Sequence, residues 1–206
     1  LLVSAPRLSL LITAIGISFL LENGAQLLFG ADTKSMDVIV PGNVTIGSTT
    51  VSYAAILTIA VAVVSMAVLT FLVQKTRLGK AMRAVSEDMG AAQLMGISLN
   101  KTISFTFAIG SALAGIGSVL YLCAYPQASP TMGSMLGLKA FVAAVLGGIG
   151  SIPGAMIGGF AIGLLEAIVA AVGLSVWKDG VVFAILIVVL LVKPTGIMGH
   201  KVTEKV

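Results

Sequence analysis

VSYAAILTIAVAVVSMAVLTFLVQ, residues 51–74, contains no charged side chain, whereas the next stretch, KTRLGKAMR at residues 75–83, contains four. At a rise of 1.5 Å per residue, a helix over residues 51–74 is about 36 Å long, enough to cross the roughly 30 Å hydrocarbon layer of a bilayer. Basic residues that flank a span concentrate on its cytoplasmic side. Residues 51–83 therefore predict a membrane-spanning helix that ends at the cytoplasm.

The apolar segment described above extends over Val51–Gln74, and the sequence contains further apolar segments. They are Leu8–Gly30, Thr102–Tyr125, Leu136–Gly173 with an interruption at Gly147–Pro153, and Val181–Val192. The chain is 58% hydrophobic and only 10% charged, so it cannot cover itself with polar surface in water. The fold class is therefore all-α. We expect a polytopic transmembrane helical bundle with one broken helix, forming a single domain over residues 1–206.

The positions of the twelve basic residues orient this bundle. Five of them lie in the loop over residues 75–101, which we place in the cytoplasm. The first arm of the interrupted segment, residues 136–146, is short for a full span. If both arms cross, nine basic residues face the cytoplasm, including Lys193, Lys201 and Lys205 near the C-terminus. If the first arm dips back instead, these three lysines are external. We favour the crossing and a cytoplasmic C-terminus.

Several classes of site are excluded by the composition. Cys123 is the only cysteine and His200 the only histidine, so an internal disulfide and a multi-ligand zinc site are both excluded. The glycines lack the spacing of a P-loop, so we expect no ATP bound to this chain. The formal charge of +4 is carried by basic residues in loops between apolar runs. Basic residues at such positions are better explained by their role in orienting the spans than by binding to nucleic acid.

Polar residues within the spans are candidates for a translocation path, because ionisable groups at membrane depth are costly. Ser18, Glu22 and Gln26 recur at every fourth position and share one face of a helix. They either line a passage for a zwitterionic solute or hydrogen-bond to neighbouring helices and the outer interface. Glu166 is a second candidate, and we hypothesise an ion pair between Glu166 and Lys139.

Small residues predict where the backbone is tightly packed. Two rows at every fourth position predict helix contacts: Gly110, Ala114 and Ser118, and Gly159, Gly163, Ala167 and Ala171. In the break, Gly147, Gly148, Gly150, Pro153 and Gly154 predict a helix that begins near Pro153. This break is either a packed connection or a site where free N–H groups attract a carboxylate. In the external loop, residues 38–47 predict a small hairpin that turns near Pro41.

The cytoplasmic loop is the most specific feature of the sequence. Ser86 is a plausible N-cap, Glu87 and Asp88 suit a first helical turn, and Gly96 suits a helix end. Ala91, Leu94 and Met95 fall on one face. The loop therefore predicts a short helix that either lies at the membrane interface or inserts into a groove on a soluble partner.

The stretch EDMGAAQLMGI, residues 87–97, resembles the coupling loop of binding-protein-dependent ABC importer permeases. It places an acid at Glu87, alanines at Ala91 and Ala92, then Gly96 and Ile97, at a spacing that differs from the general form. Residues 6–18, the stretch from Lys139 to Ala155 and residues 193–199 narrow the likeness. Together they resemble the LivH-type permease of the branched-chain amino acid ABC importer family over nearly the whole chain.

The resemblance implies the subunit's role and its partners. In such importers a permease forms the path for leucine, isoleucine or valine together with a second, related permease. Two cytoplasmic ATPases hold ATP and magnesium, and an extracytoplasmic binding protein delivers the substrate. Coupling would fall to Glu87, Asp88, Ala91, Ala92, Leu94, Gly96 and Ile97. We expect a non-enzymatic, multi-pass subunit of the bacterial inner membrane that lacks its N-terminal spans.

Two alternatives are carried beside this expectation. One is an ion-coupled secondary transporter or channel, in which Glu22 or Glu166 would hold a proton or cation. The other is an ABC permease for urea or other small polar solutes, because the substrate rests on the family likeness alone.

Overall fold

The computed structural model describes residues 7–46, 49–193 and 195–199. Helices dominate these residues, and five are long and apolar enough to span a bilayer. They are α1 (Arg7–Phe29), α2 (Tyr53–Lys75), α5 (Leu99–Ala124), α7 (Ile152–Ala171), and the continuous segment formed by the turn η1 (Ser175–Trp177) and α8 (Lys178–Val192). The expectation of an all-α polytopic membrane protein is confirmed, and every predicted span falls on a helix. The chain divides into two compact units, residues 1–132 and 133–206.

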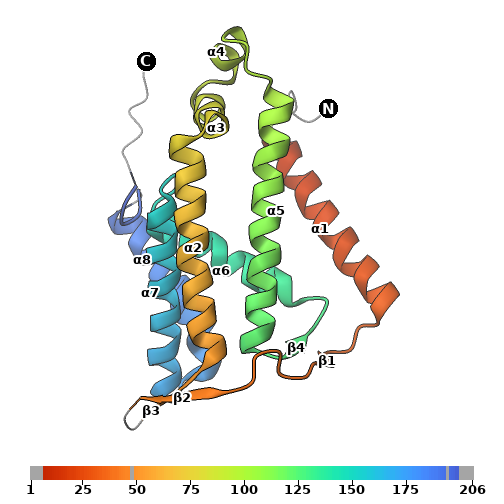
Figure 1. Ribbon diagram of the computed structural model, residues 1–206, viewed down its shortest axis with the longest axis vertical. Helices are drawn as coiled ribbons and strands as arrows, with labels where there is room; N and C mark the ends of the chain where they lie inside the picture. The colour runs from red at the N-terminus through yellow and green to blue at the C-terminus, as the bar shows by residue number, and fades with distance from the viewer. Residues whose placement is uncertain (1–6, 47–48, 194, 200–206) are drawn as a thin grey trace. The chain divides into compact units, whose positions relative to one another are not determined.

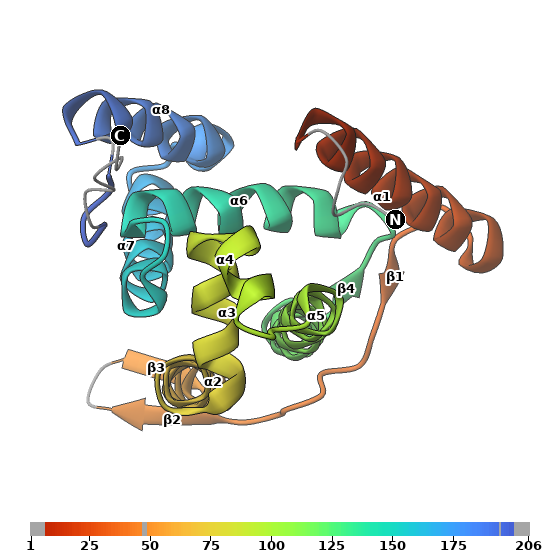
Figure 2. The same cartoon turned by 90° about the horizontal axis from the view of Figure 1, so that it is seen from above.

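In the first unit, α2 and α5 lie side by side, while α1 stands apart from both (Figures 1 and 2). The short helices α3 (Arg77–Glu87) and α4 (Met89–Leu94) join the ends of α2 and α5. Thr76 ends α2 and begins α3, because its hydroxyl accepts a hydrogen bond from the Gly79 N–H at 3.1 Å. A Cβ at Gly79 would collide with the carbonyls of Leu72 and Val73, so the sharp elbow requires glycine here.

Short strands close the opposite end of this unit. Strand β2 (Asn43–Ile46) pairs with β3 (Thr49–Ser52), and Asn43 lies opposite Ser52. A hairpin was expected, but its predicted turn near Pro41 is wrong, since the β-branched residues at 49–51 supply the second strand. Gly47 lies outside the described residues. A second ladder joins β1 (Lys34–Ser35) to β4 (Gln127–Ala128) and ties the loop after α1 to the end of α5.

The second unit consists of α6 (Met132–Gly147), α7 and α8. The predicted break is confirmed, because α6 ends at Gly147 and α7 begins at Ile152 with Pro153 in its first turn. Helix α6 runs across α7 rather than alongside it (Figure 2), whereas α7 and α8 pack together. The 16 residues of α6 rise only about 24 Å, less than the roughly 30 Å hydrocarbon layer. That α6 crosses the membrane therefore stays a prediction. His200, Lys201 and Lys205 lie outside the described residues.

The core of this unit takes one buried residue from each helix: Val142 from α6, Ile162 from α7 and Val182 from α8. The close backbone contacts lie beside it, where Gly154 and Gly158 form a buried row with Ile162 on α7. The predicted row at Gly159 and Gly163 is displaced from this face. A Cβ at Gly163 would meet nothing within 4 Å, and one at Gly159 would lie 3.8 Å from Ala143.

On α5, a Cβ added to Gly110, the first residue of the predicted row, would meet nothing within 4 Å, so Gly110 marks no close helix contact among the described residues. Both rows were read from spacing alone, which does not say which face of a helix meets a neighbour. On α7, the face that packs is set by how the chain turns at the break between α6 and α7.

We predict that Gly158→Ala destabilises the second unit by about 1–3 kcal/mol, because the new methyl group would overlap the carbonyl oxygen of Ala143. The matched control is Gly163→Ala, which adds the same group to the same helix in open space. Thermal unfolding of the full-length protein in detergent measures both. Equal midpoints for the two variants would contradict the assigned packing face.

Candidate functional site

The segment between α2 and α5 forms two helices rather than one. Ser86 was expected to cap a single helix, but this is wrong: Ser86 lies inside α3, where its hydroxyl donates to the Arg83 carbonyl at 2.7 Å. The cap is Asp88, whose Oδ1 accepts from the Ala91 N–H at 3.0 Å. Glu87 ends α3 and does not open α4. An aspartate caps as well as a serine does, so the sequence offered two equivalent starts.

The end of α4 agrees with the expectation. Gly96 has φ +83°, its N–H donates to the Gln93 carbonyl, and the Ile97 N–H donates to the Ala92 carbonyl at 3.0 Å. This pair of bonds is the Schellman arrangement, in which glycine takes the left-handed position after the helix. The chain therefore leaves α4 in a fixed direction toward α5.

The surface of this segment is apolar at its tip. Leu94 is 91% exposed and Met95 83% exposed, while Ala92 is buried within the unit. Glu87, Asp88 and Ala91 are also exposed, and Ile97 is half-buried. An exposed apolar tip beside two acids, held by a cap at each end, has the form of a docking surface.

The three candidate path residues on α1 differ in exposure. Ser18 is exposed, whereas Glu22 and Gln26 are half-buried. All three share the predicted helix face. Nothing in the described contacts assigns them a solute, so their role as a path stays a prediction.

The break between α6 and α7 is the most tightly packed part of the described chain. Residues 145–148 are four consecutive buried positions. Gly147 and Gly154 face each other with no room for a Cβ on either, and the Ser151 hydroxyl accepts from the Gly154 N–H at 3.1 Å. Gly148 and Gly150 have φ of +108° and +94°, which favour glycine. These contacts are those of a packed connection, the first of the two interpretations of this break.

The chain after α8 folds back onto this break. The Ile197 N–H donates to the Leu146 carbonyl and the Met198 N–H to the Gly147 carbonyl, both at 2.9 Å. These are carbonyls at the end of α6 that have no partner within the helix. Lys193 stabilises the tail by donating from Nζ to the Ile197 carbonyl at 2.9 Å. The tail therefore caps α6.

Three charged residues meet between the helices of the second unit. Lys139 Nζ on α6 lies 2.9 Å from Glu166 Oε1 on α7 and 2.7 Å from Asp179 Oδ1 on α8. The hypothesised pair between Lys139 and Glu166 is confirmed. Asp179 was missed, because it lies beside Lys178 at the start of α8, where an acid is expected simply to favour the helix dipole.

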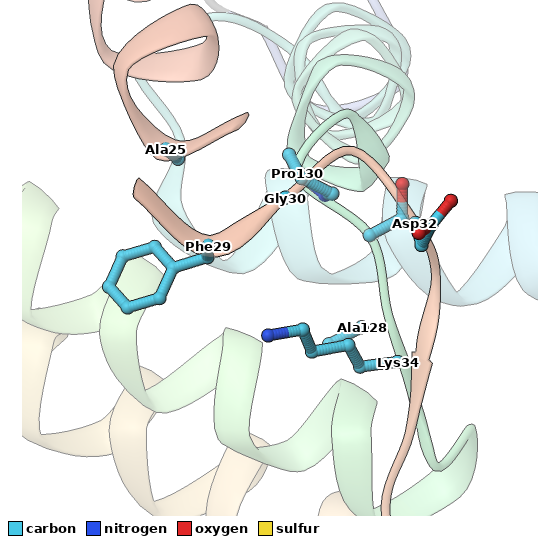
Figure 3. A pocket seen from close by; sticks show the side chains of 8 residues that line it. Ala25, Phe29, Gly30, Asp32, Lys34, Ala128 and Pro130 are labelled. Atoms are coloured by element: carbon cyan, nitrogen blue, oxygen red, sulfur yellow. The ribbon is translucent and has the colours of Figure 1, made fainter. Parts of the chain in front are cut away.

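A hollow of about 280 Å³ lies in the first unit between the end of α1 and the β1–β4 ladder. Phe29, Asp32, Lys34 and Pro130 are among the residues that line it. Figure 3 shows the Lys34 side chain reaching across the hollow toward Phe29, with the Asp32 carboxylate turned away. This hollow belongs to the end of the unit opposite α3 and α4.

Comparison with known proteins identifies the family of this chain. The sequence profile of the family described as branched-chain amino acid transport system / permease component matches residues 1–190. The chain belongs to this permease family. No solved structure matches the chain.

Individual relatives agree with the family. The permease is 44% identical to the high-affinity branched-chain amino acid transport system permease protein BraD of Pseudomonas aeruginosa, over 97% of this chain and 67% of that one. It is 43% identical to the corresponding LivH of Salmonella typhimurium and 42% identical to that of Escherichia coli K12. Each of these two alignments covers 98% of this chain and 68% of the relative. The permease thus spans about two thirds of their length.

We predict that Lys139→Met destabilises the permease more than Glu166→Gln does. Removing the lysine leaves two carboxylates without a counterion, whereas removing one acid leaves the pair between Lys139 and Asp179. All three side chains retain some exposure, so we expect the Lys139→Met loss to be about 1–3 kcal/mol, below that of a fully buried pair. Thermal unfolding in detergent provides the measurement.

The triple variant Lys139→Met, Glu166→Gln, Asp179→Asn is the control, since it removes all three charges together. It should recover part of the stability lost in Lys139→Met. A triple variant less stable than Lys139→Met alone would show that the three charges do not act as one cluster.

Proposed function

We propose that this permease is a transmembrane subunit of an ATP-driven ABC importer in the bacterial inner membrane, with branched-chain amino acids as its substrates. Its own role is conduction, and it performs no bond chemistry. ATP and magnesium would be held by two cytoplasmic ATPase subunits. A second, homologous permease completes the path, and an extracytoplasmic binding protein delivers the amino acid.

The observation that carries this proposal is the surface of α3 and α4. A helix cap at Asp88 and a glycine stop at Gly96 hold Leu94 and Met95 in an exposed position. Exposed apolar side chains mark a site of interaction with a protein or a membrane, and here we infer a groove on a protein partner. Because Thr76 and Gly79 join α3 directly to α2, movement of a docked partner would be transmitted to a spanning helix. We place this end, and the C-terminus, in the cytoplasm.

The opposite end of the first unit would face the binding protein. The β2–β3 hairpin and the hollow near Lys34 lie there. On the path between the two ends, Glu22 and Gln26 supply polar, half-buried groups on one face of α1. Glu166 is neutralised by Lys139, so we assign it to the structure of the second unit rather than to ion coupling.

Transport in proteoliposomes tests the function directly. We predict that the full-length permease, reconstituted with its partner subunits and binding protein, takes up radiolabelled leucine only when ATP is present on the ATPase side. An ion gradient without ATP should give no uptake, because no ion-coupled site is assigned. Leucine uptake driven by the gradient alone would overturn the importer proposal, and ATP-driven uptake of urea in place of leucine would redirect its substrate.

We predict that Gly96→Val weakens association with the ATPase subunits at least fivefold, because valine resists a φ of +83° and the α4 tip would turn away. Glu87→Ala should weaken association less, since that residue is exposed beside the tip. Co-purification of the ATPase from membranes measures both changes.

The matched control is Gly115→Ala, because it places a methyl group in open space on α5. Insertion into the membrane should be equal for all variants. Full ATPase retention by Gly96→Val and Glu87→Ala together would contradict the coupling role of this segment.

A further inference from the structure

A second hollow lies in the first unit beside α3 and the start of α5. Its volume is about 670 Å³, and it is lined by Leu78, Ser98, Lys101, Thr102, Ser104, Phe105 and Ala108. Leu78 is the only lining residue from α3. Ser98 precedes α5, and the remaining lining residues belong to the first turns of α5. The hollow is therefore a groove along one helix, with α3 at its upper rim.

The lining changes from polar to apolar along the helix. Ser98, Lys101 and Ser104 supply two hydroxyls and an ammonium over the first two turns, and Phe105 and Ala108 continue one turn further. The Ser98 side chain makes no capping hydrogen bond. Thr102 is buried and its hydroxyl donates to the Ser98 carbonyl at 3.0 Å, so it fixes the turn rather than serving a ligand.

Lys101 has no ion-pair partner among the described residues. Neighbouring cations reinforce its charge, because Arg77, Lys80 and Arg83 of α3 are all exposed as well. The two acids of this segment, Glu87 and Asp88, lie at the far end of α3. Taken together, these residues carry a net positive charge, which favours an anion in the groove.

The depth of the groove follows from the length of α5. Its 26 residues rise about 39 Å, which exceeds the roughly 30 Å hydrocarbon layer by about six residues. Since the basic loop marks the cytoplasmic side, these extra residues place Ser98–Ser104 at the headgroup level and Phe105 and Ala108 at the level of the acyl chains.

We propose that this groove binds the phosphate group of an anionic phospholipid of the cytoplasmic leaflet. Lys101 contacts the phosphate, Ser98 and Ser104 donate hydrogen bonds to its oxygens, and the acyl chain lies along Phe105 and Ala108. Basic pockets at this level of a bilayer bind anionic headgroups. A free phosphate ion would use the same polar groups but leave the apolar half of the groove without a partner.

The site has a consequence for the elbow between α2 and α3. Leu78 lines the groove one residue before Gly79, the position that permits the elbow. A lipid seated there contacts α3 at its root, so lipid composition would affect how firmly the coupling segment is held.

Native mass spectrometry of the full-length permease in the assembly it forms in the membrane tests this proposal. The probes are phosphatidylglycerol and phosphatidylcholine with identical acyl chains, and inorganic phosphate. We expect preferential retention of phosphatidylglycerol, and a loss of about fivefold in Lys101→Gln, the factor that corresponds to about 1 kcal/mol for one basic residue at an anionic surface.

The matched control is Lys80→Gln, which removes the same charge from α3 without altering the lining of the groove. Ala108→Phe fills the apolar half and should also reduce phosphatidylglycerol retention while Lys101 remains. Equal losses in Lys101→Gln and Lys80→Gln would reduce the effect to general surface charge and overturn the site. Displacement of the lipid by millimolar inorganic phosphate, or retention unchanged in both groove variants, would also overturn it.

Discussion

Every backbone N–H and C=O inside a bilayer needs a partner within the protein, and the second unit is organised around this constraint. A helix satisfies it along its length, but α6 stops after 16 residues and leaves carbonyls at its end. Ile197 and Met198 donate to two of them, and Ser151 accepts from the N–H of Gly154 at the start of α7. The end of α6 at residues 145–148 therefore stays buried without losing its hydrogen bonds.

This solution depends on close backbone approach, which explains where glycine is required. A Cβ at Gly148 would collide with Gly199, and one at Gly196, where φ is +75°, would collide with the Val145 carbonyl. The break and the tail, nearly fifty residues apart, are thus two halves of one structure.

The sequence predicted what depends on local pattern. Uncharged runs located the spans, a glycine located the end of α4, and opposite charges at similar depth suggested the pair of Lys139 with Glu166. Choices between equivalent local signals failed, as when Asp88 rather than Ser86 took the cap. Contacts set by the path of the chain were not visible at all. Asp179 joined the ion cluster, and the tail joined the break, only because α8 returns beside α6.

The two units differ in whether their charged side chains form ion pairs. In the second unit, Lys139 contacts two acids, and the cluster links α6, α7 and α8 without needing any other molecule. In the first unit, the cations of α3 and the start of α5 have no ion-pair partner among the described residues, while the apolar tip at Leu94 is exposed. Unpaired cations and exposed apolar side chains both gain free energy from contact with something outside the chain. The charge cluster of the second unit is thus satisfied within the chain, whereas the cations of α3 and the start of α5 are open to molecules outside it.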